Sequence, residues 1–258
     1  SVLANPDASA VFLTSPTYYG AVSALGALCA FFHQHHLQII VDAAHGAHLK
    51  AAGSAQPFKA ADYVVMSAHK TLPALGQAAL LLYNGDALEE LRFASAFFGT
   101  SSPSYPILVS IDQAVLGMQS DLGARYLACA RRTEQIKQTL QRKTAFLVPA
   151  FAQCDPCRLT VHTESAGLSG REMSGILQTQ YHIDCEMADA QNVVFILTAA
   201  DAEEEWNALE KALLAVGCGR PKIGSKLPSL PHPEIVCSPR EALFCKSVRT
   251  PLIHAAGK

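Results

Sequence analysis

Two residues, Asp42 and Lys70, have types and positions that could carry chemistry together. Asp42 directly follows the apolar run 37–41, and Lys70 lies four residues beyond the apolar run 63–66. Each run predicts a buried strand. Ligands bind at the carboxyl ends of strands in open parallel sheets, so we expect the acid and the amine at one edge of such a sheet. A simple ion pair between them is the ordinary alternative.

The residues around Lys70 favour a nucleophilic amine over an ion pair. Ser67 and His69 offer compact hydrogen-bonding groups that suit an anion. Leu72 and Leu75 follow, so we expect the amine to lie in apolar surroundings, to lose solvation and to become a nucleophile toward carbonyl groups. A lysine amine, an acid for a pyridine nitrogen and groups for a phosphate together indicate a pyridoxal phosphate site.

Alternating strands and helices are expected to position these residues. The first part of the chain predicts strands at 10–14, 37–41, 63–66 and 78–83, and helices at 21–36, 107–118 and 122–141. Apolar strands separated by helices are typical of a parallel sheet that is covered on both faces.

A smaller α/β pattern begins after residue 149. It predicts strands at 158–161 and 192–197 and helices at 169–180 and 201–216. Ser169 and Glu172 form a capping-box pattern at the start of the first of these helices. We therefore expect a large α/β domain over 1–119, a small α/β domain over 120–227, and a Pro-rich linker with the start of a further, truncated domain over 228–258.

Composition excludes several classes of protein. Half of the 258 residues are apolar and 16% are charged, which excludes a disordered chain. A net charge of −2 provides no basic field for nucleic acid or an anionic membrane. No apolar run reaches the ~18 residues of a membrane span. Eight scattered cysteines without a secretory signal indicate reduced thiols in a cytoplasmic protein.

Five segments together resemble the ornithine/lysine/arginine decarboxylases of the aspartate-aminotransferase fold. The segment 67–79 (SAHKTLPALGQAA) looks like the cofactor-attachment motif of that family, and 42–48 (DAAHGAH) resembles its motif for the cofactor nitrogen. The segments 14–20 and 99–105 resemble two loops of the family, and 238–242 resembles the start of its C-terminal domain. They occur in the order of the family.

The resemblance implies an incomplete fold type I large domain with a mostly parallel sheet, followed by a smaller α/β domain. Lys70 would bind the aldehyde of pyridoxal 5'-phosphate, Asp42 would keep its pyridine nitrogen protonated, and His45 would lie near its ring or phenolic oxygen. The remaining site residues implied are Ser67 and His69 at the phosphate, Thr14 and Tyr18 bordering the cofactor and substrate, and Ser102 and Tyr105 in a loop that reaches the partner subunit's site.

The activity implied is decarboxylation of arginine, lysine or ornithine to the amine and carbon dioxide, by a cytoplasmic homodimer or larger homo-oligomer in polyamine biosynthesis. Pro73 and Ala43 depart from the common family pattern, which has a small residue and a glutamate at these positions. Only 41 residues precede Asp42, and they contain no Gly-rich turn for a phosphate. We therefore expect this chain to be a fragment or a truncated product.

Other interpretations of the residues remain open. The chain could be another fold type I enzyme, such as an aminotransferase or a lyase. It could also be a non-catalytic chain. Asp42, His45 and His48 have the spacing of metal ligands, but that reading leaves Lys70 unexplained, so we expect no metal. Cys154-Asp155-Pro156-Cys157 is a lone CxxC, for which loop cysteines are the ordinary interpretation and a metal or redox role the alternative.

Overall fold

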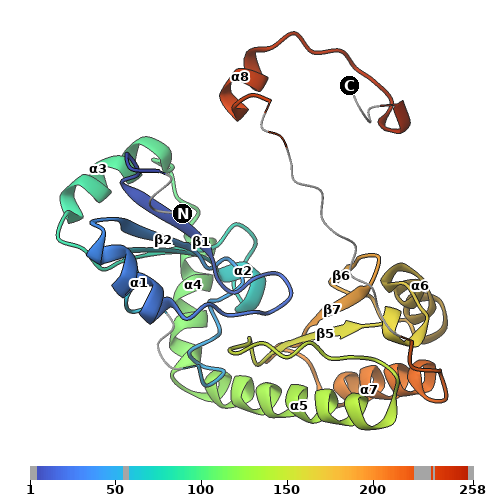
Figure 1. Cartoon of the computed structure of the whole chain (residues 1–258). Helices are drawn as coiled ribbons and strands as arrows, with labels where there is room; N and C mark the ends of the chain where they lie inside the picture. Colours follow the sequence, from blue (N-terminus) through green and yellow to red (C-terminus); the bar gives the residue numbers. More distant parts are fainter. Residues whose placement is uncertain (1–4, 55–57, 224–233, 235, 255–258) are drawn as a thin grey trace. The chain divides into compact units, whose positions relative to one another are not determined.

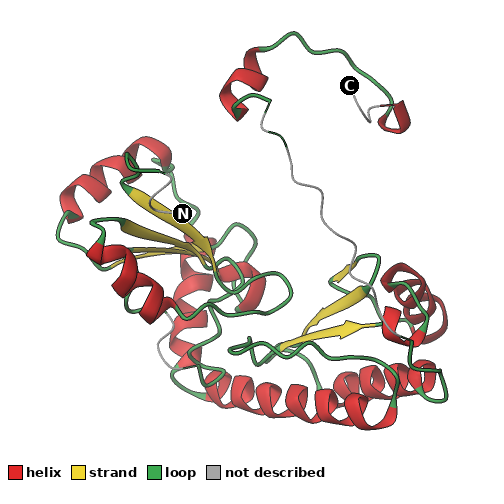
Figure 2. Cartoon of the chain, viewed as in Figure 1, coloured by secondary structure: helices red, strands yellow, loops and turns green. Residues whose placement is uncertain are grey.

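The computed structural model describes residues 5–54, 58–223, 234 and 236–254. The chain forms two compact units, Ser1–Gly224 and Ser225–Lys258, and each is treated by itself below. The first unit holds two separate sheets and the helices that pack on them (Figures 1 and 2). All predicted site residues lie in this unit.

The larger sheet has four strands in the order β1-β2-β3-β4. β1 to β3 run parallel, as expected, whereas β4 pairs antiparallel to β3. The sheet is therefore mostly parallel, with one strand at its edge reversed. Its strands are β1 (Ala10–Thr14), β2 (Gln38–Asp42), β3 (Tyr63–Ser67) and β4 (Ala79–Tyr83).

Only one face of this sheet is well covered. Ile39, Val41 and Val64 are fully buried on that face, where they share a core with Leu25 and Cys29 of α1 (Leu25–Gln34). The other face leaves several large side chains exposed. The expectation of a sheet covered on both faces is therefore wrong for the described residues. The exposed side chains on this face are Phe12, Val65 and Leu81.

Helix α1 is shorter than the predicted helix 21–36. It begins at Leu25 because the preceding residues bond elsewhere: the amide of Ala21 donates to the Thr17 hydroxyl, and the amide of Val22 donates to the carbonyl of Gln153. The segment 21–24, which follows β1 of the larger sheet, is thus hydrogen-bonded to the segment that precedes β5 of the smaller sheet.

The smaller sheet is antiparallel, with the order β5-β7-β6. One core joins it to three helices, and Ile136, Leu159 and Leu213 are fully buried there. The capping box predicted at Ser169 is present, because its hydroxyl accepts from the Glu172 amide. The elements are β5 (Arg158–His162), β6 (Met187–Ala188), β7 (Asn192–Ile196), α5 (Asp121–Lys143), α6 (Gly170–Tyr181) and α7 (Glu203–Gly217).

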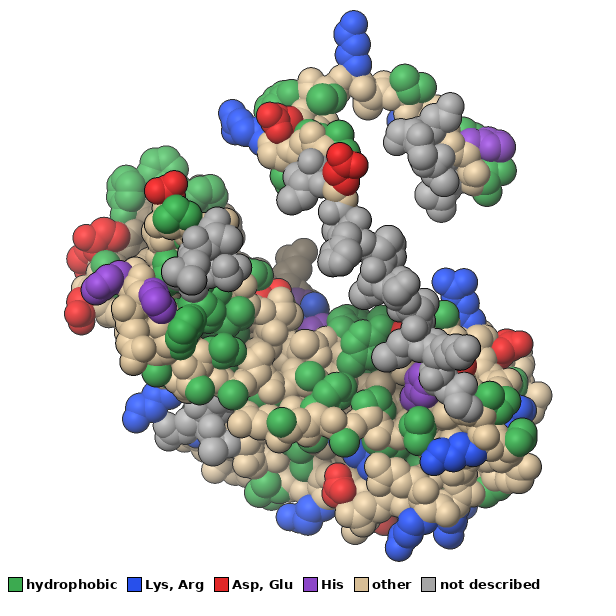
Figure 3. Space-filling model, in the orientation of Figure 1, with side chains coloured by type: hydrophobic (Ala, Val, Ile, Leu, Met, Phe, Trp, Pro, Cys, Tyr) green, Lys and Arg blue, Asp and Glu red, His purple; other side chains and the backbone are tan. Residues whose placement is uncertain are grey.

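The remaining elements are mostly exposed. Helix α3 (Leu88–Phe98) was not predicted and buries none of its residues, and α4 (Tyr105–Met118) buries only Ala114. Figure 3 shows hydrophobic side chains at the surface of the first unit. Among the described residues, no helix has both the length and the apolar character needed to cross a membrane. Two further short elements are α2 (Ala68–Thr71) and the 3-10 turn Glu164–Ala166.

The second unit contains α8 (Pro239–Phe244) and a 3-10 turn (Leu252–His254). A capping box between Ser238 and Glu241 starts α8. The predicted Pro-rich linker around Pro228, Pro231 and Pro233 lies outside the described residues. All eight cysteines are free thiols, of which Cys154, Cys218, Cys237 and Cys245 are exposed.

Candidate active site

The register of the large sheet brings three predicted site residues to one edge. Thr14 pairs with Asp42, and Asp42 pairs with Val65, so these side chains form one row on the same face. Ser67 follows Val65 by two residues and therefore points to that face as well. This is the face that the sheet leaves exposed. The predicted meeting of the strand ends is confirmed.

The carboxylate of Asp42 has a defined orientation at this edge. Its Oδ1 accepts a hydrogen bond from the amide of Ala44 at 3.0 Å, and the side chain is half-buried. The backbone beside it is fixed from both sides, because its carbonyl accepts from the Ser15 amide and the next amide, that of Ala43, donates to the Val65 carbonyl. A carboxylate held in this way can face one fixed partner.

Lys70 lies on α2, the single helical turn that follows β3. This turn is anchored because the Tyr126 hydroxyl of α5 donates to the carbonyl of Thr71. Lys70 itself is exposed, as is Leu75, while Leu72 points into the core. The expectation of apolar, desolvated surroundings for Lys70 is therefore wrong in this chain. The short turn directs Leu72 into the core and leaves Lys70 at the surface.

A cavity of about 220 Å³ opens beside Lys70. It lies between α2, the first turns of α5 and the loop after β7. Helix α5 contributes the side chains of Arg125 and Tyr126 to the wall of the cavity, and the loop after β7 contributes Thr198. The cavity has room for a small ligand next to the lysine amine.

His45 is the centre of the site. Its ring is buried, with Nε2 3.5 Å from Nζ of Lys70 and Nδ1 accepting a hydrogen bond from Nη2 of Arg158 at 3.2 Å. The ring of Tyr18 meets it edge-on, with centroids 4.9 Å apart. Burial first, and then the charges of Arg158 and Lys70, lower the pKa of His45 to about 4, although Glu186 opposes the shift.

The groups expected to bind the phosphate differ in their exposure and in their hydrogen bonds. The exposed His69 donates from Nδ1 to the carbonyl of Ala78 at 2.8 Å, which leaves its Nε2 for another partner. Ser67 is half-buried and Thr14 is exposed at the strand ends. Both can meet a ligand that approaches the open face.

Two acids hold a pair of tyrosines in the loop after β1. The Tyr18 hydroxyl donates to Oε1 of Glu186 at 2.5 Å, and the Tyr19 hydroxyl donates to Oδ2 of Asp189 at 2.6 Å. The hydrogen bond to Glu186, with burial, raises the pKa of Tyr18, and the bond to Asp189 raises the pKa of Tyr19 to about 12. Tyr18 thus contacts His45 and holds the exposed carboxylate of Glu186 near it, while its predicted place beside the substrate stays a prediction.

The loop with Ser102 and Tyr105 is not joined to this cluster. Both residues are exposed, and the Ser102 amide bonds only to the nearby Thr100 hydroxyl. Within the described part of the chain, no hydrogen bond or ion pair connects them to Lys70 or His45. Their predicted role toward a partner subunit stays a prediction.

Sequence reasoning missed Arg158 and Glu186, which reach the site from the smaller sheet. Arg158 begins β5, 113 residues after His45, and Glu186 lies 168 residues after Tyr18. An arginine at the first position of a predicted apolar strand is the signal that could have identified Arg158, because such a strand is expected to be buried. The second stands in a segment that gives no such signal.

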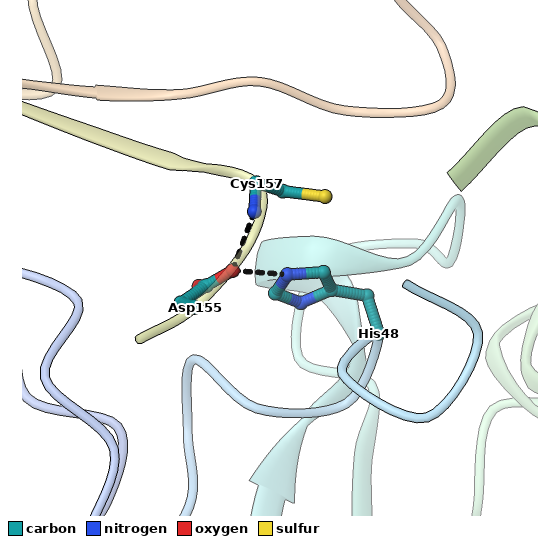
Figure 4. A group of neighbouring side chains, drawn as sticks. All are labelled: His48, Asp155 and Cys157. Carbon is teal, nitrogen blue, oxygen red and sulfur yellow. Dashed lines mark hydrogen bonds and ion pairs between the residues drawn. The ribbon is translucent and has the colours of Figure 1, made fainter. Parts of the chain in front are cut away.

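A second buried cluster is formed by His48, Asp155 and Cys157 (Figure 4), and Arg158 contacts both this cluster and His45. Asp155 Oδ1 accepts from Nε2 of His48 and from the amide of Cys157, each at 2.9 Å, and Oδ2 lies 3.7 Å from Nε of Arg158. Burial alone would raise the pKa of Asp155, but His48, Arg158 and the Cys157 amide outweigh it and hold that pKa below its usual value.

His45 and His48, which the sequence offered as ligands of one metal site, belong to two different clusters. His45 contacts Lys70 and Arg158, whereas His48 contacts Asp155. The ligand atoms of the second cluster lie within 4.8 Å of one another, but Arg158 already balances the charge of its carboxylate. Cys154 and Cys157 lie in the turn before β5, with Cys154 exposed and Cys157 buried. A hydrogen bond with Cys129 and burial raise the pKa of the Cys157 thiol.

The model of the family "Orn/Lys/Arg decarboxylase, major domain" matches residues 1–153, more than half of the chain. The chain belongs to this family. The expected resemblance is confirmed. An uncharacterized protein of Bacillus subtilis, YaaO, is 35% identical over 206 residues, which cover 75% of this chain and 42% of that protein. An arginine decarboxylase of Halalkalibacterium halodurans is 25% identical over 276 residues, which cover 99% of this chain and 56% of that protein.

The fold is also found among solved structures. The lysine decarboxylase LdcF of Francisella novicida superposes with a TM-score of 0.64 at 17% identity, over 80% of this chain and 35% of that one. This likeness confirms the expected fold class, an α/β fold of the pyridoxal phosphate fold type I enzymes. The chain spans about half the length of the curated relatives that it matches.

The residues of this Orn/Lys/Arg decarboxylase family member fit the cofactor that the family implies. Asp42 and Lys70 lie at the ends of neighbouring strands on one edge, with Asp42 on the open face of the sheet. One oxygen of the Asp42 carboxylate is held by a backbone amide, so the other can face a pyridine nitrogen. The donors at Ser67 and His69 lie beside the lysine in sequence and suit a phosphate.

Proposed function

We propose that the protein is a pyridoxal phosphate-dependent decarboxylase of a basic amino acid, arginine, lysine or ornithine. The observation that carries this proposal is the arrangement of Asp42, His45 and Lys70 at one edge of the sheet, in a chain of this family. When it is bound, the cofactor supplies an electron sink for the bond to the α-carboxylate. The protein supplies the groups that hold and orient it.

Each residue has a distinct task in this proposal. The exposed amine of Lys70 would be the nucleophile that holds the cofactor through its aldehyde. The Asp42 carboxylate holds a proton at the pyridine nitrogen, because a fixed negative charge stabilises the cationic ring. His45, buried and uncharged at neutral pH, offers a ring nitrogen beside Lys70. Ser67 and His69 would donate hydrogen bonds to the phosphate.

The basic side chain of the substrate is matched by Glu186. This exposed carboxylate is held by Tyr18, whose ring contacts His45, so it lies near the reacting centre and carries the charge that an ammonium or guanidinium group requires. Glu186→Gln is therefore expected to raise KM for arginine, lysine and ornithine more than it lowers kcat.

The attachment to Lys70 can be tested on the purified chain. The protein is incubated with pyridoxal phosphate, reduced with borohydride and digested, and the modified peptide is located by mass spectrometry. We expect the label on Lys70, its loss in Lys70→Ala, and no change in the control Lys50→Ala, which removes another exposed lysine. A label spread evenly over the lysines, or none, would refute the assignment.

The reaction type needs a second measurement on the same protein. Release of carbon dioxide from the three basic amino acids supports a decarboxylase, whereas formation of a keto acid identifies an aminotransferase. Cofactor attachment without turnover of any amino acid identifies a non-catalytic chain. Asp42→Asn is expected to lower the rate of decarboxylation about a thousandfold, because the barrier rises by about 4 kcal/mol.

The proposal extends to organisation and assembly. We propose the parts 1–119, 120–227 and 228–258 as domains, supported at the first boundary by the start of α5, which packs with α7 and β5. We also propose a cytoplasmic homodimer or larger homo-oligomer, in which the loop with Ser102 and Tyr105 reaches the partner subunit's site. The native mass of the protein tests the assembly.

A further inference from the structure

The contact between Arg158 and His45 is enclosed on all sides that the structure describes. Arg158 is 2% exposed and His45 is 8% exposed, and Nη2 lies 3.2 Å from Nδ1. Arg158 begins β5 and His45 lies in the loop after β2, so the contact exists only in the folded chain. Neither the cofactor nor the substrate needs to be present for it to form.

The backbone of the loop after β1 is shaped to admit the arginine stem. Gly20 has a φ of +90°, and a Cβ at this position would lie 2.7 Å from Cγ of Arg158. The guanidinium is placed by Nε at 3.7 Å from Oδ2 of Asp155 and lies over the ring of Tyr18, 6.0 Å from its centroid. Arg158 therefore has one defined position.

A guanidinium can only donate hydrogen bonds, and it stays charged at every pH of interest. Nδ1 of His45 must therefore accept, and it carries no proton while this bond exists. In a neutral imidazole the single proton then resides on Nε2, the nitrogen that lies 3.5 Å from Nζ of Lys70. An ammonium on Lys70 would also only donate, but its contact is the longer of the two and Lys70 is exposed, so its amine can turn to water, whereas the buried Arg158 cannot. The arginine on the smaller sheet decides whether the ring nitrogen that faces the lysine carries the proton.

We propose that Arg158 is a positioning residue that holds His45 as the Nε2–H tautomer, so that an N–H donor faces Lys70 and the edge of the bound cofactor. The tautomer concerns this chain alone, while its use toward the cofactor rests on the proposed function. The donor can serve the lone pair of an uncharged amine or an anionic oxygen of the cofactor. The other tautomer would present a lone pair to the same groups.

The surrounding charges keep the ring in its neutral form. The groups that face His45 are Lys70 on α2, Arg158 at the start of β5, Asp155 in the turn before β5, Tyr18 in the loop after β1, and Glu186 before β6. Burial and the two cations favour the uncharged ring, and they outweigh the two acids, so the pKa of His45 lies near 4. At neutral pH the tautomer, rather than the charge, is what Arg158 sets.

The tautomer can be measured directly in the full chain without the cofactor. Two-bond 1H–15N correlation spectra separate protonated from unprotonated ring nitrogens, and His45→Gln identifies the signals of His45 among the ten histidines. In the unaltered protein we expect a protonated Nε2 and an unprotonated Nδ1. Signals that show a proton on Nδ1 would overturn the proposal.

Substitutions at Arg158 provide the second test. In Arg158→Met we expect a mixture of the two tautomers and a pKa of His45 that rises toward 6.5 but does not reach it, because burial remains. Arg158→Lys should restore the Nε2–H tautomer, since an ammonium also only donates. Arg132→Met is the matched control, because this largely buried arginine pairs with Glu210 on α7, away from His45. It should leave the His45 signals unchanged.

Folding of each variant is checked by thermal unfolding before its spectra are interpreted. If Arg158→Met does not fold, Gly20→Ala displaces the arginine stem instead and should shift the His45 signals in the same direction. Unchanged tautomer and pKa in these variants would refute the role of Arg158. Failure of cofactor attachment with the expected tautomer would refute the proposed function and leave this inference standing.

Discussion

Replacing Asp155 with alanine should be one of the most damaging changes to the stability of this chain. The carboxylate is 1% exposed, and it accepts from His48 and from the amide of Cys157 while it balances the charge of Arg158. Its removal leaves a guanidinium buried without a counter-charge. Breaking a buried pair in this way costs about 3–5 kcal/mol, which is a large share of the ~5–15 kcal/mol that stabilises an ordinary domain.

The pH dependence of this effect has a definite sign. The pKa of Asp155 in the folded protein lies below its ordinary value, so the carboxylate stabilises the fold above that ordinary value and stops doing so as the pH falls through the folded one. The difference in free energy of unfolding between the unaltered protein and Asp155→Ala is therefore full at pH 7. It shrinks below about pH 4.

Urea unfolding followed by the fluorescence of Trp206 measures this difference. Glu89→Ala is the control, because Glu89 pairs with Arg92 at 2.7 Å on the surface, where both side chains are more than 60% exposed, and it should cost less than about 1 kcal/mol. Asp155→Asn keeps the shape and should fall between the two. An Asp155→Ala cost no larger than that of Glu89→Ala would refute the reasoning.

Three further predictions concern other parts of the fold. His45 has a pKa near 4 in the folded protein, so as the pH falls the imidazole takes up its second proton in the unfolded chain before it does so in the folded one. The free energy of unfolding should therefore fall by roughly 1–3 kcal/mol between pH 7 and pH 4. His45→Gln should flatten this part of the pH dependence measured by urea unfolding. Gly170→Ala should lower the melting temperature by several degrees, because its Cβ would collide with the carbonyl of Asn192. Ile136→Ala should cost about 2–5 kcal/mol in urea unfolding, since Ile136 is fully buried.

The strands of the large sheet could be predicted from the sequence because their signal is local. Apolar runs of four to six residues ended at the same places as the observed strands, to within one or two residues. Ser169 and Glu172 likewise specify their helix start within three residues of chain. Since Asp42 and Ser67 end such strands, their meeting at one edge followed from the topology of parallel sheets.

The direction of β4 and the exposure of the second face could not be predicted in this way. An apolar run at 78–83 has the same pattern whether its strand runs parallel or antiparallel. The burial of Lys70 was predicted wrongly because its neighbours were taken as its surroundings. Leu72, which directly follows a helix of only four residues, points inward, while Lys70 on that helix points outward.

Arg158 could not be found by any local pattern, because its meaning depends on a residue 113 positions away. Read in the sequence, it is the first residue of a strand. In the fold it is enclosed by Gly20 and His45, which come from two other segments, and by Asp155, three residues before it. Such a contact becomes visible only when the two sheets are packed together.

The distribution of the thiols makes the chain a reporter of its own unfolding. Cys154, Cys218, Cys237 and Cys245 are exposed, two in each unit, whereas Cys29, Cys129 and Cys157 are buried. A maleimide added to the native protein would therefore mark the first group quickly, and the second only as molecules open. The mass added over time would distinguish local opening from global loss of structure, without an introduced probe.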